Sequence, residues 1–255
     1  MTGRCSPYHQ SMAFPDLAPI GALIAVPTRA AVLAELIDGR VLTVGDLAAR
    51  IGVTAQTASW HLSKLVEGGL LVAVSQGRHR YYRLAGPQVA EALEGLGGLA
   101  PMPTARDRFE REVLSGLRFA RSCYGHLAGR LAVAMRDRFL VMGLIVPVGI
   151  EHEVTPAGHS WFGRIGVDVE AARSSRRSFA RACVDWSERR PHLAGALGDA
   201  LLAAMIQRRW IMCQSNERAV QLTEAGRLWV TRSVGIDLSG DHPPASREID
   251  DRSGG

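Results

Sequence analysis

Between residues 43 and 84 the hydrophobic pattern changes from a helical period to the alternation of short strands. Residues 43–51 place apolar side chains three to four positions apart behind a threonine suited to capping a helix. Gly52 is expected to end that helix, and Thr54 to cap a second one with an apolar face around Leu62 and a polar face opposite. The runs LLVAVS and RHRYYRL then flank Gln76-Gly77 as a β-hairpin would. The pattern predicts a helix-turn-helix followed by a two-stranded wing.

The polar face of the second helix and the hairpin carry side chains that suit duplex DNA. Glutamine pairs with an adenine edge, hydroxyl groups reach bases or phosphates, and lysine and arginine neutralise phosphates. The indole at position 60 either presses on a thymine methyl group or packs sideways on the wing. Residues 54–84 have a formal charge of +3, a large part of the chain's net +5. The candidate DNA-binding residues are Thr54, Gln56, Thr57, Ser59, Trp60, Lys64, Arg78, His79 and Arg80.

Length and composition leave room for a second domain. The chain has 255 residues, of which 47% are hydrophobic, and a single winged helix needs far fewer. There is no long uninterrupted apolar run and no signal-peptide pattern at the N-terminus, so we expect a cytoplasmic protein without a membrane partner. The 4 cysteines are too few and too scattered for a disulfide scaffold.

Glycine and proline density marks the expected domain boundary at GLGGLAPMPT, residues 95–104. Both ends lack a periodic pattern and are rich in small or polar residues, which predicts disorder. The expected organisation is a disordered N-terminus at 1–16, a DNA-binding domain at 17–98, a regulatory or dimer-supporting domain at 104–237, and a disordered tail at 238–255.

The second domain contains an internal duplication. Its repeated segments are FARSC and FARAC (119–123 and 179–183), two copies of HLAG (126–129 and 192–195), and TPAGHSW and TEAGRLW (155–161 and 223–229). The repeat units span about 119–168 and 179–237. Each is expected to form a helix after HLAG, a hairpin, and a helix opened by threonine. The predicted fold class is therefore mainly α with small β-hairpins, an α+β chain of a winged helix-turn-helix and two similar helix-hairpin-helix units.

Each repeat also pairs a cysteine with a histidine: Cys123 with His126, and Cys183 with His192. The first spacing, C-x-x-H, is expected to place both side chains on one helical turn, and two such pairs suit a tetrahedral metal site with two sulfur and two nitrogen ligands. Two alternatives stand beside it. Cysteines near Arg121 or Arg181 would suit a thiol-based sensor. The other alternative, which the small size of the repeated side chains favours, is a structural role copied along with the repeat.

The stretch from Ala22 to Leu84 resembles the ArsR/SmtB family of bacterial transcriptional regulators. It carries VPTRAAVLAEL, LTVGDLAARIGVTAQTASWHLSKLVEGGLL and QGRHRYYRL. The resemblance implies a cytoplasmic homodimer that binds a palindromic operator on double-stranded DNA, usually as a repressor released by an inducer. The chain departs from metal-sensing members, because residues 41–47 and the recognition helix hold no cysteine and residues 86–98 hold no histidine.

The sequence offers no motif for catalysis. A phosphate-binding glycine loop, a G-x-S-x-G elbow and an H-E-x-x-H pair are all absent, and the polar group Asp185, Glu188 and Arg189 is expected at a solvated helix end. We therefore expect a regulator rather than an enzyme, with a metal ion or a small molecule as inducer. The alternatives left open are a metal- or thiol-responsive sensor and a DNA-binding protein whose second domain is purely structural.

Overall fold

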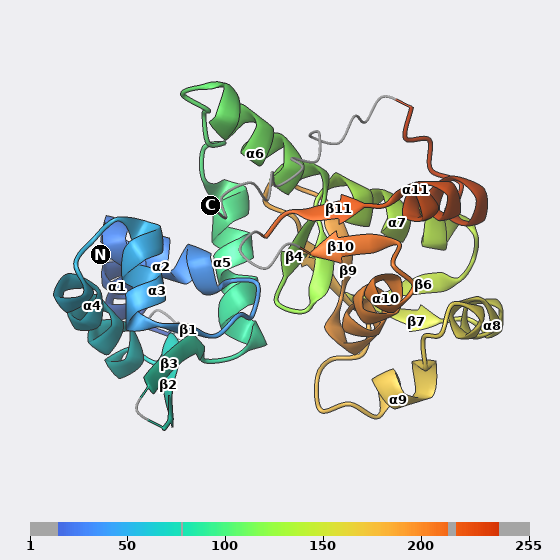
Figure 1. Cartoon of the computed structure of the whole chain (residues 1–255). Helices are drawn as coiled ribbons and strands as arrows, with labels where there is room; N and C mark the ends of the chain where they lie inside the picture. The colour runs from blue at the N-terminus through green and yellow to red at the C-terminus, as the bar shows by residue number, and fades with distance from the viewer. Residues whose placement is uncertain (1–14, 78, 214–217, 240–255) are drawn as a thin grey trace, which may run out of the picture. The chain divides into compact units, whose positions relative to one another are not determined.

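The computed structural model describes residues 15–77, 79–213 and 218–239, and it divides into two compact units (Figure 1). The first unit ends at Ala85, apart from the short segment Ile37–Gly39, which groups with the second. The second unit begins at Gly86. The ends expected to be disordered lie almost entirely outside the described residues.

The first unit is the winged helix-turn-helix that the hydrophobic pattern predicts. Its three strands form an antiparallel sheet in the order β1-β3-β2. The elements are α1 (Ala18–Ile24), α2 (Pro27–Leu36), β1 (Leu42–Thr43), α3 (Val44–Ile51), α4 (Ala55–Glu67), β2 (Leu71–Gln76) and β3 (His79–Leu84). Leu33, Leu47, Leu62 and Leu65 are fully or almost fully buried between the helices. No single described helix is long and apolar enough to cross a membrane, although α1 and α2, bent by 86°, pass that test of length and composition as a pair.

The caps of α3 and α4 fix the turn between these two helices. The Thr43 side chain accepts a hydrogen bond from the Asp46 backbone, and the Asp46 carboxylate accepts one in return, which completes a capping box. Gly52 ends α3 with φ +70°, a left-handed conformation that glycine adopts without strain. Thr54 then caps α4 by accepting a hydrogen bond from the Thr57 backbone. Local sequence signals therefore set the angle at which α4 is presented.

Helix α5 (Pro87–Leu99) corrects the expected domain boundary. The structure groups this helix with the second unit, whereas residues 86–98 were expected in the first. Glu94 of α5 is only 1% exposed, and a Cβ added at Gly97 would lie 3.2 Å from Trp186. The glycines that suggested a linker therefore continue the helix and let it pack closely.

The second unit repeats one order of elements twice. In each half a hairpin, a helix, a second hairpin and a second helix follow one another. The first half comprises β4 (Arg121–Cys123), β5 (His126–Ala128), α7 (Arg130–Val141), β6 (Ile145–Val148), β7 (Glu151–Val154) and α8 (Pro156–Arg164), after α6 (Arg108–Phe119). After α9 (Val169–Arg173), the second half comprises β8 (Arg181–Val184), β9 (Pro191–Ala194), α10 (Gly195–Gln207), β10 (Ile211–Cys213), β11 (Val220–Leu222) and α11 (Glu224–Trp229), followed by a π-helical turn at Val230–Val234. The hairpin that opens each half was not expected.

The hairpin that opens each half is bound to the later hairpin of the other half. The opening hairpin of the second half joins the first half's later hairpin in a four-stranded sheet of order β6-β7-β8-β9. Backbone N–H groups of His152 and Ala182 donate to Ala180 and Ile150 across that junction. The same two bonds recur between β11 and β4, where Val220 donates to Ala120 and Ser122 donates to Arg218. The duplication is thus an interlocked pair in which each half completes the other.

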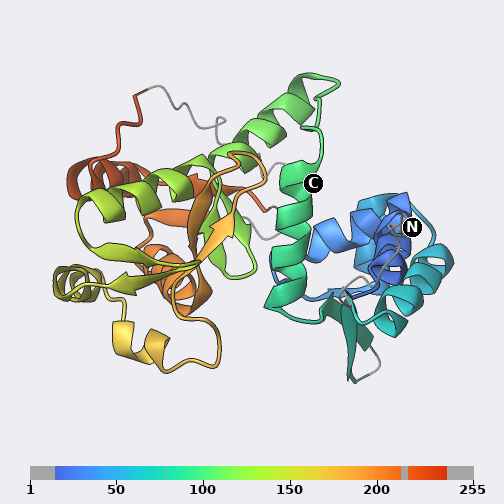
Figure 2. The ribbon, with the colours of Figure 1, turned by 180° about the vertical axis from the view of Figure 1, so that it is seen from behind.

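Helices α7 and α10 enclose the opening hairpins from opposite sides. Helix α10 lies in front of the strands in Figure 1, and α7 lies in front of them in Figure 2. Both helices contact β5 and β9. Leu197, Leu201 and Met205 of α10 are buried in the common core with Leu131 and Phe139 of α7. The apolar character of α10 is explained by this burial within the chain.

Gly158 in the repeated T-x-A-G motif gives a test of how closely the chain packs. A Cβ at this position would lie 2.0 Å from the Leu144 backbone carbonyl oxygen. We expect Gly158→Ala to destabilise the protein by about 2–4 kcal/mol, because the backbone must move to relieve the overlap. Gly163→Ala in the same helix is the matched control, since nothing lies within 4 Å of its added Cβ. It should leave the unfolding free energy in urea unchanged or raise it by up to about 1 kcal/mol, and equal losses for the two variants would contradict the packing argument.

Candidate functional site

The outer face of α4 presents most of the predicted base-reading side chains to solvent. Gln56, Thr57, Ser59 and Trp60 are exposed, while Ala58, Leu62 and Leu65 point into the core. The Thr54 and Thr57 hydroxyl groups lie 2.9 Å apart and share the helix cap. Trp60 is 58% exposed and its ring meets His61 edge-on, rather than packing as a buried residue. This face offers amide, hydroxyl and indole groups on one rigid helix.

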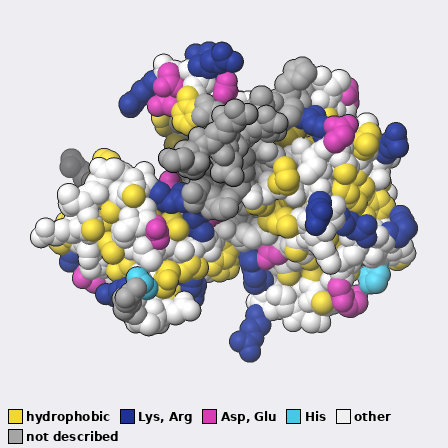
Figure 3. All heavy atoms as spheres, in the orientation of Figure 1, with side chains coloured by type: hydrophobic (Ala, Val, Ile, Leu, Met, Phe, Trp, Pro, Cys, Tyr) yellow, Lys and Arg dark blue, Asp and Glu magenta, His cyan; other side chains and the backbone are white. Residues whose placement is uncertain are grey.

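The wing adds positive charge beside that helix. Strands β2 and β3 pair over six residues in a register that matches Gln76 with His79. His79 and Arg80 are exposed at the far end of β3, and the Arg80 guanidinium lies 5.6 Å from the Tyr82 ring centroid. Figure 3 shows basic and histidine side chains near this end of the first unit. Lys64 of α4 is held 2.8 Å from Glu67, and Arg78 lies outside the described residues.

The structure brings together the second predicted group, Cys123, His126, Cys183 and His192. All four are buried, and one ligand atom from each lies within 4.8 Å of the others. The expected helical turn is wrong, because Cys123 and His126 are opposed residues of the β4–β5 hairpin. Cys183 and His192 are opposed in the same way on β8 and β9. Opposed residues of antiparallel strands carry their side chains on one face, so each hairpin contributes one cysteine and one histidine.

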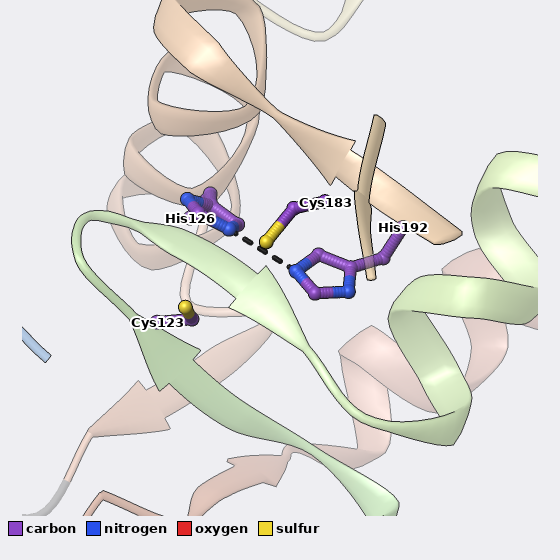
Figure 4. A group of neighbouring side chains, drawn as sticks. All are labelled: Cys123, His126, Cys183 and His192. Carbon is purple, nitrogen blue, oxygen red and sulfur yellow. Dashed lines mark hydrogen bonds between the residues drawn. The ribbon is translucent and has the colours of Figure 1, made fainter. Parts of the chain in front are cut away.

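The two imidazole rings meet at the centre of this cluster (Figure 4). His126 Nε2 and His192 Nε2 lie 3.1 Å apart, and the Cys183 sulfur lies beside them. The remaining ring nitrogens face carboxylates: His126 Nδ1 is 3.9 Å from Asp199 and His192 Nδ1 is 3.5 Å from Asp185. The hairpins therefore direct two nitrogen and two sulfur atoms toward one small volume.

Burial and mutual contact determine the protonation of this cluster. Burial lowers the pKa of His126 and favours the neutral ring. The contact between the two cysteines raises the pKa of Cys123 and lowers the pKa of Cys183, which the two neighbouring histidines lower further. A lowered pKa at Cys183 and a neutral ring at His126 both favour the binding of a cation.

Asp185 lies in a different environment from the one that its sequence pattern predicts. Instead of a solvated helix end, it is fully buried and receives hydrogen bonds from Arg121 at 3.0 Å and the Gly129 backbone at 2.6 Å. Arg121 is also fully buried and donates to Glu94 of α5 at 3.1 Å. Although burial raises the pKa of Asp185, the Arg121 charge and hydrogen bonds from Ser187 and Gly129 bring it down to about 2. Only the long-range pairing of the two halves reveals this network.

The comparisons with known proteins agree with the described geometry. A helix-turn-helix domain family matches residues 23–74. The HTH-type transcriptional regulator YdfF of Bacillus subtilis is 39% identical over 224 residues, which cover 88% of this chain and 99% of YdfF. The HTH-type transcriptional regulator CmtR of Mycobacterium tuberculosis is 46% identical over 77 residues, or 30% of this chain and 64% of CmtR. The chain belongs to the ArsR/SmtB-like HTH-type transcriptional regulators.

A solved structure is similar to part of this ArsR/SmtB-like regulator. The NMR structure of the cadmium metal-sensor CmtR from Mycobacterium tuberculosis is 39% identical and covers 36% of this chain and 100% of CmtR, with a TM-score of 0.29. The match with YdfF extends over most of the second unit as well as the first, because it covers 88% of the chain. The expected family, and the expectation of a DNA-binding regulator rather than an enzyme, are confirmed.

Removing the charge of Asp185 tests the buried network of this regulator. We expect Asp185→Asn to destabilise the protein by about 3–5 kcal/mol, because the buried Arg121 charge would lose one of the two carboxylates that balance it. Asp137→Asn is the control, since Asp137 pairs with Arg190 near the surface, and it should cost less than about 1 kcal/mol. Urea unfolding at pH 7 measures both. The lowered pKa of Asp185 means that its contribution is complete at neutral pH and is lost as the pH falls from its ordinary pKa toward about 2.

Proposed function

We propose that this regulator binds a palindromic operator on double-stranded DNA as a homodimer and acts in the cytoplasm as a repressor released by an inducer. The observation that carries the proposal is the exposed polar face of α4, capped at Thr54 and placed beside a basic wing. A helix of this kind enters the major groove, where a glutamine distinguishes adenine from the other bases. The basic wing supplies the phosphate contacts that position the protein.

Individual side chains divide between these two tasks. Gln56 is exposed in the first turn of α4, where residues of a recognition helix reach base edges. Arg80 and His79 are exposed on β3 and suit phosphate contacts, as does Lys64 once it leaves Glu67. Trp60 is large, exposed and on the same face of α4, which suits contact with a thymine methyl group or a sugar.

The second unit is the proposed site of regulation. It has its own core and holds α5, the helix that follows the wing along the chain. Both repeats fix this helix through equivalent arginines, since Arg121 binds Glu94 and Arg181 binds Glu91. A ligand that changes the second unit would therefore act directly on the segment leading from the wing. This arrangement favours a regulatory role over a passive spacer.

The wing is tested by the salt dependence of DNA binding. We expect Arg80→Ala to weaken binding to all duplex sequences and to reduce the slope of log affinity against log salt by about 1, because one phosphate contact is lost. Fluorescence anisotropy with the DNA upstream of the protein's own gene measures this slope. Arg176→Ala, an exposed arginine of the second unit, is the matched control and should leave the slope unchanged. An unchanged slope for Arg80→Ala would remove the wing from the interface.

Gln56→Ala provides the contrasting variant. It should leave the salt slope intact and reduce discrimination at one base pair by about 1–3 kcal/mol, because glutamine reads a base edge rather than a phosphate. Binding to a panel of single-base operator variants measures the effect. If Gln56→Ala weakens binding equally to every sequence, α4 does not read the operator through this residue.

The proposed dimer makes a separate prediction. One recognition helix covers a half-site, so a two-fold operator needs two chains related by a two-fold axis. Light scattering at micromolar concentration should give twice the mass of the 27.5 kDa chain. The DNA complex should contain two chains per palindrome, and a single chain on an intact operator would contradict the proposal.

A further inference from the structure

We propose that Cys123, His126, Cys183 and His192 form a tetrahedral site for a divalent cation of the zinc type in the second unit. Nothing in the similarity to CmtR assigns this site, because the match with CmtR spans only 77 residues, or 30% of the chain. The proposal depends on how the two opening hairpins place four donor atoms. Two thiolates and two imidazoles are a ligand set that zinc favours in structural sites.

The distances between the four donor atoms are close to those around a tetrahedral ion. Two nitrogens bound to zinc at its usual bond length lie about 3.3–3.4 Å apart, and two sulfurs about 3.8 Å apart. His126 Nε2 and His192 Nε2 lie 3.1 Å apart, and all four donor atoms lie within 4.8 Å of one another. Small side-chain rotations therefore bring all four donors to bonding distance.

The backbone holds the donors in place before any ion arrives. The turn Tyr124-Gly125 closes β4 and β5 with two left-handed residues, at φ +39° and +99°, which is the conformation of a tight type I′ hairpin. That turn places Cys123 directly opposite His126. The second hairpin, closed by the longer segment 185–190, likewise places Cys183 opposite His192, and β5 contacts β9. A site preorganised in this way loses little conformational entropy on binding.

Carboxylates behind the histidines complete the arrangement of a metal centre. A histidine that ligates zinc through one ring nitrogen usually donates from the other to a carboxylate or carbonyl group. His126 and His192 both leave Nδ1 without a hydrogen bond among the described residues, and both nitrogens are buried. Asp199 Oδ1 is likewise unpartnered within the described chain and lies 3.9 Å from His126 Nδ1, while Asp185 lies 3.5 Å from His192 Nδ1. If both histidines bound the ion through Nε2, each Nδ1–H would be directed at a carboxylate that could accept its hydrogen bond.

The site is also connected to the proposed regulation, and this step rests on the proposed function. Asp185 faces His192 and binds Arg121, and Arg121 binds Glu94 of α5. An ion that draws His192 toward the cluster centre changes the distance between His192 and Asp185. Because Asp185 and Glu94 of α5 bind the same Arg121, this movement also changes how α5 packs on the second unit. Because α5 follows the wing along the chain, we infer that occupancy of the site alters DNA affinity.

Cobalt provides the direct test of the metal site. The full-length chain, reduced and stripped with a chelator, is titrated with Co²⁺ and then with Zn²⁺. We expect one Co²⁺ per chain, the intense visible absorption of tetrahedral cobalt, a sulfur-to-cobalt charge-transfer band, and displacement by Zn²⁺. Weak octahedral absorption without the charge-transfer band would overturn the proposal, as would formation of a Cys123–Cys183 disulfide in a chain that binds no ion when reduced.

Substituted chains distinguish the loss of a metal ligand from a failure to fold. Cys123→Ser and Cys183→Ser should each abolish tight Co²⁺ binding and weaken the charge-transfer band, while Cys213→Ser, at an exposed cysteine, should match the parent. Asp199→Asn keeps every ligand and should weaken Co²⁺ binding by about 10–100-fold, because the carboxylate beside His126 is lost together with its ion pair to Arg177. Circular dichroism of each apoprotein identifies any variant that fails to fold. Cysteine variants that fold and bind Co²⁺ as the parent does would exclude these ligands.

DNA binding is measured separately with and without Zn²⁺. We expect operator affinity to change by about 5–150-fold in the parent, the usual range of coupling between two sites, and to remain constant in Cys183→Ser. A chain that binds Co²⁺ tetrahedrally and shows the same operator affinity with and without Zn²⁺ would refute the regulatory step alone. Loss of duplex binding under every condition, with the cobalt spectrum intact, would instead refute the proposed function.

Discussion

A two-stranded hairpin is marginally stable on its own in water, and the second unit is built around this constraint. Each half begins with a hairpin of three or four residues per strand, too short to form a sheet alone. Each hairpin gains a pairing partner from the other half: β8 pairs with β7, and Arg121 of β4 forms an isolated bridge with Ala219, the residue before β11. Because neither half completes its strands without the other, the duplication folds as one body. The cysteines and histidines meet where the exchanged hairpins cross.

The exchange also explains why the unit tolerates fully buried charges. Arg121 enters the core on β4, where an unpaired guanidinium would be costly. Asp185, which follows β8 of the other half, and Glu94 of α5 both bind it, and the Trp186 ring lies 4.6 Å away. One arginine thus joins three segments that are distant in the sequence. The equivalent Arg181 binds Glu91 one helical turn earlier, so α5 is fixed by both repeats.

Local signals in the sequence were sufficient to predict the fold of the first unit and insufficient to predict that of the second. Thr43, Gly52 and Thr54 encode caps and a turn that act within a few residues, so α3 and α4 could be predicted with their exposed faces. The C-x-x-H spacing fits either a helical turn or a tight hairpin, and only Gly125 beside Tyr124 favours the hairpin. Asp185 in DWSERR resembled a surface residue because its partner Arg121 lies 64 residues away. The unit against which α5 packs depends on Trp186 and on the ion pairs of buried Glu94 and half-buried Glu91, all of which involve residues distant in the sequence.

The four donor atoms at the centre of the second unit are difficult to explain by packing alone. Small apolar residues would fill the space between the two hairpins without the cost of burying two imidazoles and two cysteine side chains. The cluster instead retains polar atoms that lack hydrogen bonds within the described residues, and it aligns them with two carboxylates. A cation at the centre would bind the sulfur atoms and both Nε2 atoms, and it would orient both Nδ1–H groups toward Asp185 and Asp199. The same cation would act on Asp185, which is the residue that connects the crossing to Arg121 and α5.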